Sequence, residues 1–389
     1  MRIGIDALFV LPGINQGITT YLCNLLKNLL EIDKQNEYIL FVGKENKGIF
    51  MFDRDRIQEV QCPIRSSLRP LRVFWEQVIL PIQVKKYGLD LFFSPGHVSP
   101  ILCPVRVVET IHDTYYACHP ENVPKIELFL WQILNGLSAR NADKIITLSA
   151  NAKRDIVRAF KVKEEKVAVT YAAVEDRFHP HYPEEEIEVV KQKYGLGKKY
   201  LLSVAIMRSN KNIQRLFEAF NILKTQYRIE HQLVLVGTVS KEFKGLQKKD
   251  VILTGYVPDE ELPLLYCGAS LLVHPSFFEG FGLPVLEAMA CGTPVVASNV
   301  TSLPEIIGEA GLLFDPFKPE EMASAVYRIL SDKVLQQDLI KKGLQRANEF
   351  SWQKTAKQTL TVFEEKGNKT NETHMSCSLT KRDENREDI

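Results

Sequence analysis

Two glutamates that stand eight positions apart are the first residues in this sequence that could carry chemistry. Glu279 and Glu287 lie in HPSFFEGFGLPVLEAMACGTPVVAS, residues 274–298, and Gly280 and Gly282 lie between them. A stretch of this kind can hold a catalytic pair of carboxylates, a cradle for a phosphate, or only a capped helix between two strands. The surrounding elements are needed to decide among these interpretations.

The residues around the pair predict a strand, a loop and a helix. Residues 271–274 read as a buried strand, and the loop leaves its carboxyl end. Pro284 suits the first helical position, and Gly292 and Pro294 end the helix. The unpaired N–H groups at the helix start then face a crevice, which suits a diphosphate or a sugar hydroxyl, and glycine lets a ligand approach the backbone. The residues near these N–H groups are Phe281, Gly282 and Leu283.

A purely structural role for the two glutamates is the alternative. Glu287 would fall in the first turn of the helix, where a carboxylate complements the helix dipole. Glu279 would then be a solvated loop residue. For an isolated pair of glutamates this structural interpretation is the commoner one. The glycines and the proline between them, directly after a buried strand, favour a functional site instead.

Length and composition indicate the class of protein. A chain of 389 residues is long enough for two domains of similar size. Its 45% hydrophobic and 25% charged residues are typical of a soluble globular protein. The net charge of +1 lacks the basic excess of a nucleic-acid binder, so nucleic acid is not an expected partner.

The cellular compartment is inferred from the N-terminus and the cysteines. The opening residues, MRIGIDALFVLPG, lack the pattern of a signal peptide, and no segment approaches the roughly 20 apolar residues of a membrane span. Seven scattered cysteines form no CxxC or paired metal spacing, which indicates reduced thiols. We therefore expect a cytoplasmic protein.

Short apolar runs alternate with amphipathic stretches in two series, the pattern of β-α units on parallel sheets. The first series of expected strands comprises residues 2–9, 37–42, 89–94, 106–112, 144–149 and 166–171. The second comprises residues 200–206, 231–237, 251–256, 269–275 and 294–298. A segment rich in proline and charge separates them. We predict an α/β chain with two Rossmann-like parallel-sheet domains, residues 1–180 and 181–351, which face each other across a ligand-binding cleft. The polar residues 367–389 are expected to be disordered.

Residues 274–298 resemble the signature of glycosyltransferase family 4, the "glycosyl transferases group 1" enzymes, and the likeness continues through SNVTSLPEIIGEAGLLFDPFKPEEMASAV (298–326). The resemblance implies the two-domain GT-B fold and transfer of a sugar from a nucleotide-sugar donor with retention of anomeric configuration. The two spaced acidic residues of the family fall on Glu279 and Glu287. It follows from the resemblance that Glu279 lies near the donor sugar and that Glu287 holds the ribose hydroxyls.

The start of the second domain resembles the part of the family that grips the donor diphosphate. In LLSVAIMRSNKNIQRLFEAF (201–220), Lys211 matches the loop lysine, Arg208 is offset from the usual arginine, and Ala205 replaces a glycine. Since no acidic metal-binding cluster is apparent, these two cations are the expected partners of the diphosphate, and neither a metal nor another cofactor is expected. The alternative for Arg208 is a solvated basic loop.

Other segments carry the resemblance across the chain. Tyr256 and Val257 stand where relatives receive the nucleotide base through backbone groups. Glu305 in SLPEII recurs in the family, although stabilisation of a helix start explains it equally well. Residues 352–366 look like the family's final helix, which packs back on the first domain.

The first domain supplies the opposite side of the cleft. His112 and Asp113 end an expected strand; a lone histidine is more often structural, but the resemblance implies a hydrogen bond from His112 to a donor-sugar hydroxyl, with Asp113 in support. Gly17 is the expected loop glycine before the first helix, where a phosphate or an acceptor approaches.

These observations predict a retaining glycosyltransferase that transfers a hexose from a GDP- or UDP-linked donor to a glycan or lipid-linked glycan acceptor. We expect the transferred hexose to be mannose, because the sequence resembles mannosyltransferases of surface-polysaccharide assembly. A non-catalytic binding or scaffold protein on the same fold is the alternative. A dehydrogenase is disfavoured because the N-terminal loop lacks GxGxxG.

Residues 64–86 interleave arginines with large apolar residues. Such a stretch can lie on an anionic membrane surface, or it can be a helix that packs on its own domain with its arginines in solvent. The sequence leaves both interpretations open, and the oligomeric state is not indicated.

Overall fold

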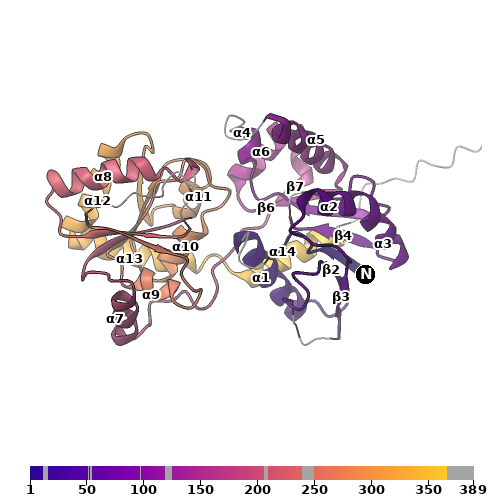
Figure 1. Ribbon diagram of the computed structural model, residues 1–389, viewed down its shortest axis with the longest axis horizontal. Helices are drawn as coiled ribbons and strands as arrows, with labels where there is room; N and C mark the ends of the chain where they lie inside the picture. Colours follow the sequence, from indigo (N-terminus) through magenta and orange to yellow (C-terminus); the bar gives the residue numbers. More distant parts are fainter. Residues whose placement is uncertain are drawn as a thin grey trace, which may run out of the picture.

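The computed structural model describes residues 1–11, 16–50, 52, 55–96, 98–118, 125–205, 209–238 and 249–365. Figure 1 shows two bodies, each built on one sheet with helices packed around it. All strand pairs in both sheets are parallel. The expected fold class, two Rossmann-like parallel-sheet domains, is confirmed.

The first sheet has seven strands in the order β3-β2-β1-β4-β5-β6-β7. Its central strands are continuous buried runs, because helices cover a parallel sheet on both faces. The edge strand β3 was not expected, since its sequence IQEVQ is largely polar. In the structure, its residues are half-buried or exposed. The strands are β1 (Arg2–Asp6), β2 (Glu37–Val42), β3 (Ile57–Gln61), β4 (Leu91–Ser94), β5 (Arg106–Thr110), β6 (Lys144–Thr147) and β7 (Val167–Val169).

Helices cover both faces of this sheet. The longer ones are amphipathic; α1, for example, buries Tyr21, Leu25 and Leu29 at helical spacing. The helical segments are α1 (Gln16–Ile32), α2 (Arg69–Phe74), the π-helical turn η1 (Trp75–Ile79), α3 (Leu80–Lys86), α4 (Tyr115–Cys118), α5 (Lys125–Asn141), α6 (Ala150–Phe160) and the 3₁₀ turn η3 (Glu164–Lys166).

The second sheet has six strands in the order β10-β9-β8-β11-β12-β13. Its last strand, β13, was not among the expected ones; it is four residues long and incompletely buried. The strands are β8 (Tyr200–Val204), β9 (Gln232–Val236), β10 (Val251–Gly255), β11 (Leu271–His274), β12 (Val295–Ser298) and β13 (Gly311–Phe314). The helical segments are α7 (Glu184–Lys193), the 3₁₀ turn η4 (Ser209–Lys211), α8 (Ile213–Thr225), α9 (Leu262–Cys267), α10 (Leu283–Ala290), α11 (Leu303–Ile307), α12 (Pro319–Ser331) and α13 (Lys333–Ala347).

The last helix, α14 (Trp352–Glu364), leaves the second domain and packs against α1 of the first (Figure 1). Ser351 caps its start by accepting a hydrogen bond from Lys354 N. At its other end, the guanidinium of Arg106 donates to two of the last carbonyls, those of Val362 and Phe363, at 2.7 Å each. Helix α14 is therefore held at both ends.

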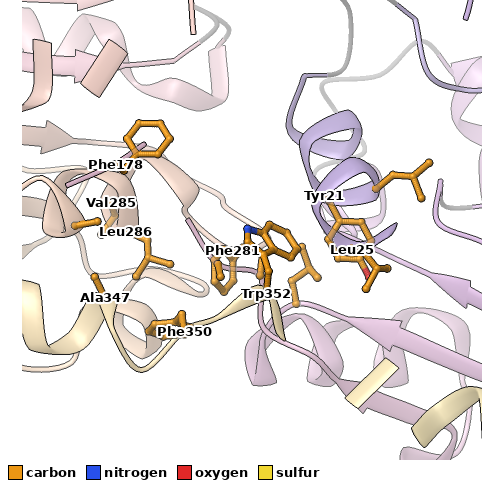
Figure 2. Close-up of a cluster of buried hydrophobic side chains, with 14 of the residues drawn as sticks. Tyr21, Leu25, Phe178, Phe281, Val285, Leu286, Ala347, Phe350 and Trp352 are labelled. Atoms are coloured by element: carbon orange, nitrogen blue, oxygen red, sulfur yellow. The ribbon is translucent and has the colours of Figure 1, made fainter. Parts of the chain in front are cut away.

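An apolar core is continuous from one domain to the other. In Figure 2, Phe178, Val285 and Leu286 lie on one side, Tyr21 and Leu25 on the other, and Phe281 and Trp352 between them. The ring of Phe350 packs edge-on against Phe281, with centroids 6.0 Å apart, and against Tyr171, at 5.6 Å. Aromatic burial thus contributes to the contact between the domains.

No helix among the described residues is both long enough and apolar enough to cross a bilayer.

Phe363 in α14 is fully buried and packs against Phe93 of β4. We predict that Phe363→Ala lowers the free energy of unfolding by about 3–5 kcal/mol, because it leaves a cavity between α14 and the first sheet. Urea denaturation followed by circular dichroism measures the change. Thr361→Ala, at an exposed position of the same helix, is the matched control. Equal stability of the two variants would contradict the role given to α14.

Candidate active site

Strand order brings two distant loops together at the centre of the second domain. β8 and β11 are parallel neighbours, although β9 and β10 lie between them in sequence. The segments that follow their carboxyl ends carry Lys211 and Glu279. Lys211 Nζ donates a hydrogen bond to Glu279 Oε1 at 2.6 Å. The point where strand order reverses is the usual ligand-binding edge of such a sheet.

Glu279 is fixed on several sides. His274 Nε2 lies 2.8 Å from the same Oε1 atom. The backbone of Glu279 donates to Thr301 Oγ1 at 3.1 Å and accepts from Ser302 Oγ at 2.9 Å. Burial opposes ionisation, but the charge of Lys211 and the contact with His274 outweigh it, so the pKa of Glu279 lies well below its ordinary value. Glu279 is therefore a permanent anion and is unsuited to proton transfer near neutral pH.

Glu287 has the opposite electrostatic state. Burial raises its pKa to about 7, and the Tyr266 hydroxyl donates to its Oε2 at 2.8 Å. The expectation that it lies in the first turn of α10 is wrong: the helix begins at Leu283, Pro284 is its second residue, and Glu287 is the fifth. A role in complementing the helix dipole therefore does not apply.

The glycines between the two glutamates serve different purposes. Gly282 caps α10 with a φ of 109°, a conformation that favours glycine. At Gly280, a Cβ atom would lie 2.3 Å from the carbonyl oxygen of His112 in the first domain. The group that closely approaches Gly280 is thus the backbone of the other domain, whereas a ligand was expected there. Ser149 Oγ of the first domain also donates to the Gly280 carbonyl, at 2.9 Å.

His112 and Asp113 follow β5 and lie next to the loop that carries Glu279. The ring of His112 is buried, stands edge-on to Tyr21 at 5.0 Å, and has Nε2 2.8 Å from the carbonyl oxygen of Pro95. Because a carbonyl only accepts, His112 Nε2 carries the proton of this hydrogen bond. Asp113 Oδ1 accepts from Tyr115 N at 3.0 Å, where α4 starts.

The structure places the remaining predicted residues as follows. Gly17 is exposed and is the second residue of α1, whereas it was expected in the loop before this helix; a Cβ atom would meet open space there. Tyr256 is exposed and Val257 buried, just beyond the carboxyl end of β10. Phe281 is buried between the domains. Arg208 lies outside the described residues.

Sequence reasoning missed the residues that hold Glu279. His274 ends a buried strand directly before the loop, and this position was the available signal for it. Thr301 and Ser302 follow β12, the strand next to β11, but nothing local in their sequence indicates a contact with Glu279.

Within the described ranges, no group of three or more histidine, cysteine, aspartate or glutamate side chains is arranged to hold a metal ion. The structure places Lys211 at this edge of the sheet, and its side chain is 19% exposed and so remains accessible.

Comparison with known proteins identifies the relatives of this arrangement. Residues 15–178 match the family described as Glycosyltransferase Family 4, and residues 185–346 the one described as Glycosyl transferases group 1. The chain is similar to O-antigen chain mannosyltransferase B of Escherichia coli, with 36% identity over 305 residues that cover 76% of this chain and 78% of that protein. It is also similar to the serotype-specific mannosyltransferase WbdA of Escherichia coli, with 32% identity over 57% of this chain but only 29% of that protein.

Two solved structures share the fold. WaaG, a glycosyltransferase involved in lipopolysaccharide biosynthesis, superposes with a TM-score of 0.73 at 15% identity, covering 94% of this chain and all of that one. Sucrose-phosphate synthase from Thermosynechococcus elongatus gives 0.72 at 21% identity, covering 93% and 98%. At these identities the likeness concerns the fold alone.

The raised pKa of Glu287 predicts a pH-dependent stability. Because the folded pKa is about 7 and the ordinary value 4.5, the stabilisation by the neutral form is complete below the ordinary value and is lost as pH rises through about 7. Glu287→Gln keeps an acceptor for Tyr266 and cannot ionise. Its free energy of unfolding relative to wild type should rise by about 3 kcal/mol between about pH 4 and pH 9.

Thermal or urea unfolding across this pH range, without nucleotide, tests the expectation. The exposed Glu320→Gln is the control and should follow wild type. A constant difference between Glu287→Gln and wild type at all pH values would show that Glu287 does not titrate as described.

Proposed function

Since the chain belongs to glycosyltransferase family 4 and is a glycosyltransferase, we propose that it transfers mannose from a nucleotide-sugar donor to a glycan or lipid-linked glycan acceptor, with retention of configuration. The observation that carries this proposal is the Lys211–Glu279 pair at the strand-order reversal, which faces His112 and Asp113 of the other domain. A sugar held between the two domains would meet groups from both.

The donor diphosphate is assigned to the edge of the second sheet. Lys211 has three N–H donors and so can bind a phosphate oxygen while it keeps its contact with Glu279. The start of α10 adds the positive end of a helix dipole, and Arg208 is a further candidate cation. No metal is required in this proposal, because lysine and helix dipole offset the charge of the leaving group.

The sugar and nucleoside are assigned to the other site residues. The anionic Glu279 accepts hydrogen bonds from sugar hydroxyls, and His112 is assigned a further hydrogen bond to a sugar hydroxyl from the opposite domain. Glu287 binds the ribose hydroxyls, and the base lies along Tyr256 and Val257. The acceptor hydroxyl attacks on the face from which the diphosphate departs, and its proton passes to the leaving phosphate. No enzyme nucleophile is needed for this route.

The choice of sugar, nucleotide and pathway is supported by the relatives. The two Escherichia coli relatives named above are mannosyltransferases, one of them of O-antigen chains. We therefore take mannose, carried by GDP or alternatively UDP, as the transferred hexose, and polysaccharide biosynthesis as the process. The cytoplasm is the proposed compartment, since that is where nucleotide sugars are expected.

We further propose that the first domain docks on the membrane that carries a lipid-linked acceptor. The helical stretch from α2 to α3 exposes an apolar stripe at helical spacing, and α5 exposes a second one. The two are adjacent, because the guanidinium of Arg69 lies 4.2 Å from the ring centre of Trp131. Exposed apolar residues of the two stripes are Leu68, Leu71, Phe74, Val78, Ile82, Phe129, Leu130, Ile133 and Leu137.

The charges around these stripes suit an anionic surface. Arg65, Arg69, Lys85 and Lys86 are exposed, whereas Glu76, the one acid in residues 64–86, is buried. Of the two interpretations of this stretch, membrane contact is thus the one that accounts for apolar side chains in solvent.

For the transfer reaction, we predict that Glu279→Gln and Lys211→Ala each lower kcat/KM by about 100-fold or more, because each removes a charged partner of the bound donor. Formation of glycosylated product from GDP-mannose and a lipid-linked acceptor extract is measured by mass spectrometry. Glu320→Gln should retain wild-type turnover. Wild-type rates in Glu279→Gln would refute the assignment, and a binding or scaffold protein would show no transfer in any variant.

For membrane docking, we predict that the wild type co-floats with vesicles that contain anionic phosphatidylglycerol and not with purely zwitterionic vesicles. Phe74→Ser with Ile133→Ser should reduce the bound fraction by about tenfold, because burial of both apolar side chains in lipid is lost. Val334→Ser, which alters an exposed apolar residue of the second domain, is the control. Equal flotation of both variants would exclude this surface.

A further inference from the structure

The carboxylate of Glu305 crosses from the second domain to the first. Its Oε1 accepts from Ala150 N at 2.8 Å and its Oε2 from Asn151 N at 3.1 Å. The hydroxyl of Tyr171, also in the first domain, donates to Oε1 at 2.8 Å. Glu305 lies in the first turn of its own short helix α11, but these three donors belong to the other domain. Two of them are the unpaired N–H groups that begin α6, where a negative charge is favoured.

The backbone around Glu305 is fastened within the second domain. Arg346 in α13 donates to the carbonyl of Glu305 at 2.6 Å and to the carbonyl of Ile306 at 3.0 Å. Its guanidinium also lies 4.9 Å from the ring centre of Phe350, in the aromatic contact between the domains. The backbone that carries the Glu305 carboxylate is therefore anchored to α13 of the second domain.

The same end of α6 contacts the loop of the candidate active site. Ser149, the residue that caps α6 by accepting from Ala152 N, also donates to the carbonyl of Gly280. Three residues before Glu305, Ser302 donates to the carbonyls of Glu279 and Phe281, at 2.9 and 2.8 Å. Within this short segment, Ser302 thus contacts the loop that carries Glu279, and Glu305 contacts the first domain.

We propose that Glu305 is a positioning residue that clasps the two domains and so sets the distance from Glu279 and Lys211 to His112 and Asp113. This inference rests on the function proposed above for those four residues. When the domains separate, Glu305 loses three donors and α6 loses a charged cap, so the clasp favours the closed arrangement. Glu305 acts through geometry and is not assigned a contact with the donor.

The domain arrangement is tested without catalysis. Small-angle X-ray scattering of Glu305→Ala should show a larger radius of gyration than wild type, and Tyr171→Phe, which removes one donor and keeps the ring, a smaller increase. Glu309→Ala, at an exposed position of the same segment, should match wild type. An unchanged radius of gyration in Glu305→Ala would overturn the clasp. Because Tyr171→Phe leaves the helix cap in place, it gives a result even where Glu305→Ala does not fold.

Kinetics then separate positioning from mere stability. We expect Glu305→Ala to lower kcat by roughly ten- to a hundredfold, with the Kd of GDP changed by less than about threefold, because chemistry across the cleft depends on alignment of the domains. Glu305→Gln retains one acceptor oxygen and should recover part of kcat. An unchanged kcat, or an equal loss in GDP affinity, would overturn the proposal. If Glu305→Ala has a larger radius of gyration but the separate variant Glu279→Gln transfers sugar at the wild-type rate, the proposed function is refuted and the clasp is retained.

Discussion

All strands of each sheet run in parallel, and this constraint brings the candidate site residues to one edge of each sheet. Since the carboxyl ends of parallel strands share one edge, the loops after β8 and β11 must meet, and Lys211 and Glu279 become partners. In the first domain, His112 likewise lies just beyond the carboxyl end of β5. The two edges face each other through a contact so close that Gly280 has no room for a side chain. Chain topology thus brings together residues that local sequence leaves far apart.

Two glutamates of one loop and helix acquire opposite properties from their surroundings. Glu279 stands beside a lysine and a histidine and stays charged, whereas Glu287 is half-buried beside a tyrosine hydroxyl and has a pKa near neutrality. Their chemical identity is the same, so the difference comes from neighbours that only the folded chain supplies. A permanent anion suits the recognition of hydroxyl groups, whereas a carboxyl with a pKa near neutrality makes the stability of the fold responsive to pH.

The extent to which sequence predicted this structure follows from the range of the interactions involved. Buried apolar runs predicted the two series of strands, but not the polar edge strand β3 or the short strand β13, whose patterns are weak. Spacing singled out Glu279 and Glu287, because both belong to one local motif. His274 belongs to the same motif, but its contact with Glu279 depends on how the loop folds back, which the local sequence does not indicate.

Contacts between domains were beyond local pattern altogether. The sequence allowed Glu305 to stabilise the start of its own helix. In the structure, its carboxylate instead accepts hydrogen bonds from the first N–H groups of α6 in the other domain. Gly280 was expected to admit a ligand, and it admits the backbone of His112. Both outcomes depend on the relative placement of two bodies, which no periodicity or capping signal encodes.

Helix α14 also determines the order in which the protein can be completed during synthesis. The first sheet includes β4 and β5, but Phe93 and Arg106 on these strands find their partners in the last helix, more than two hundred residues later in the chain. The first domain therefore leaves the ribosome before α14 can cover Phe93 or accept the hydrogen bonds of Arg106. It becomes complete only after the whole second domain has emerged, so the two domains are coupled in biogenesis as well as in the folded state.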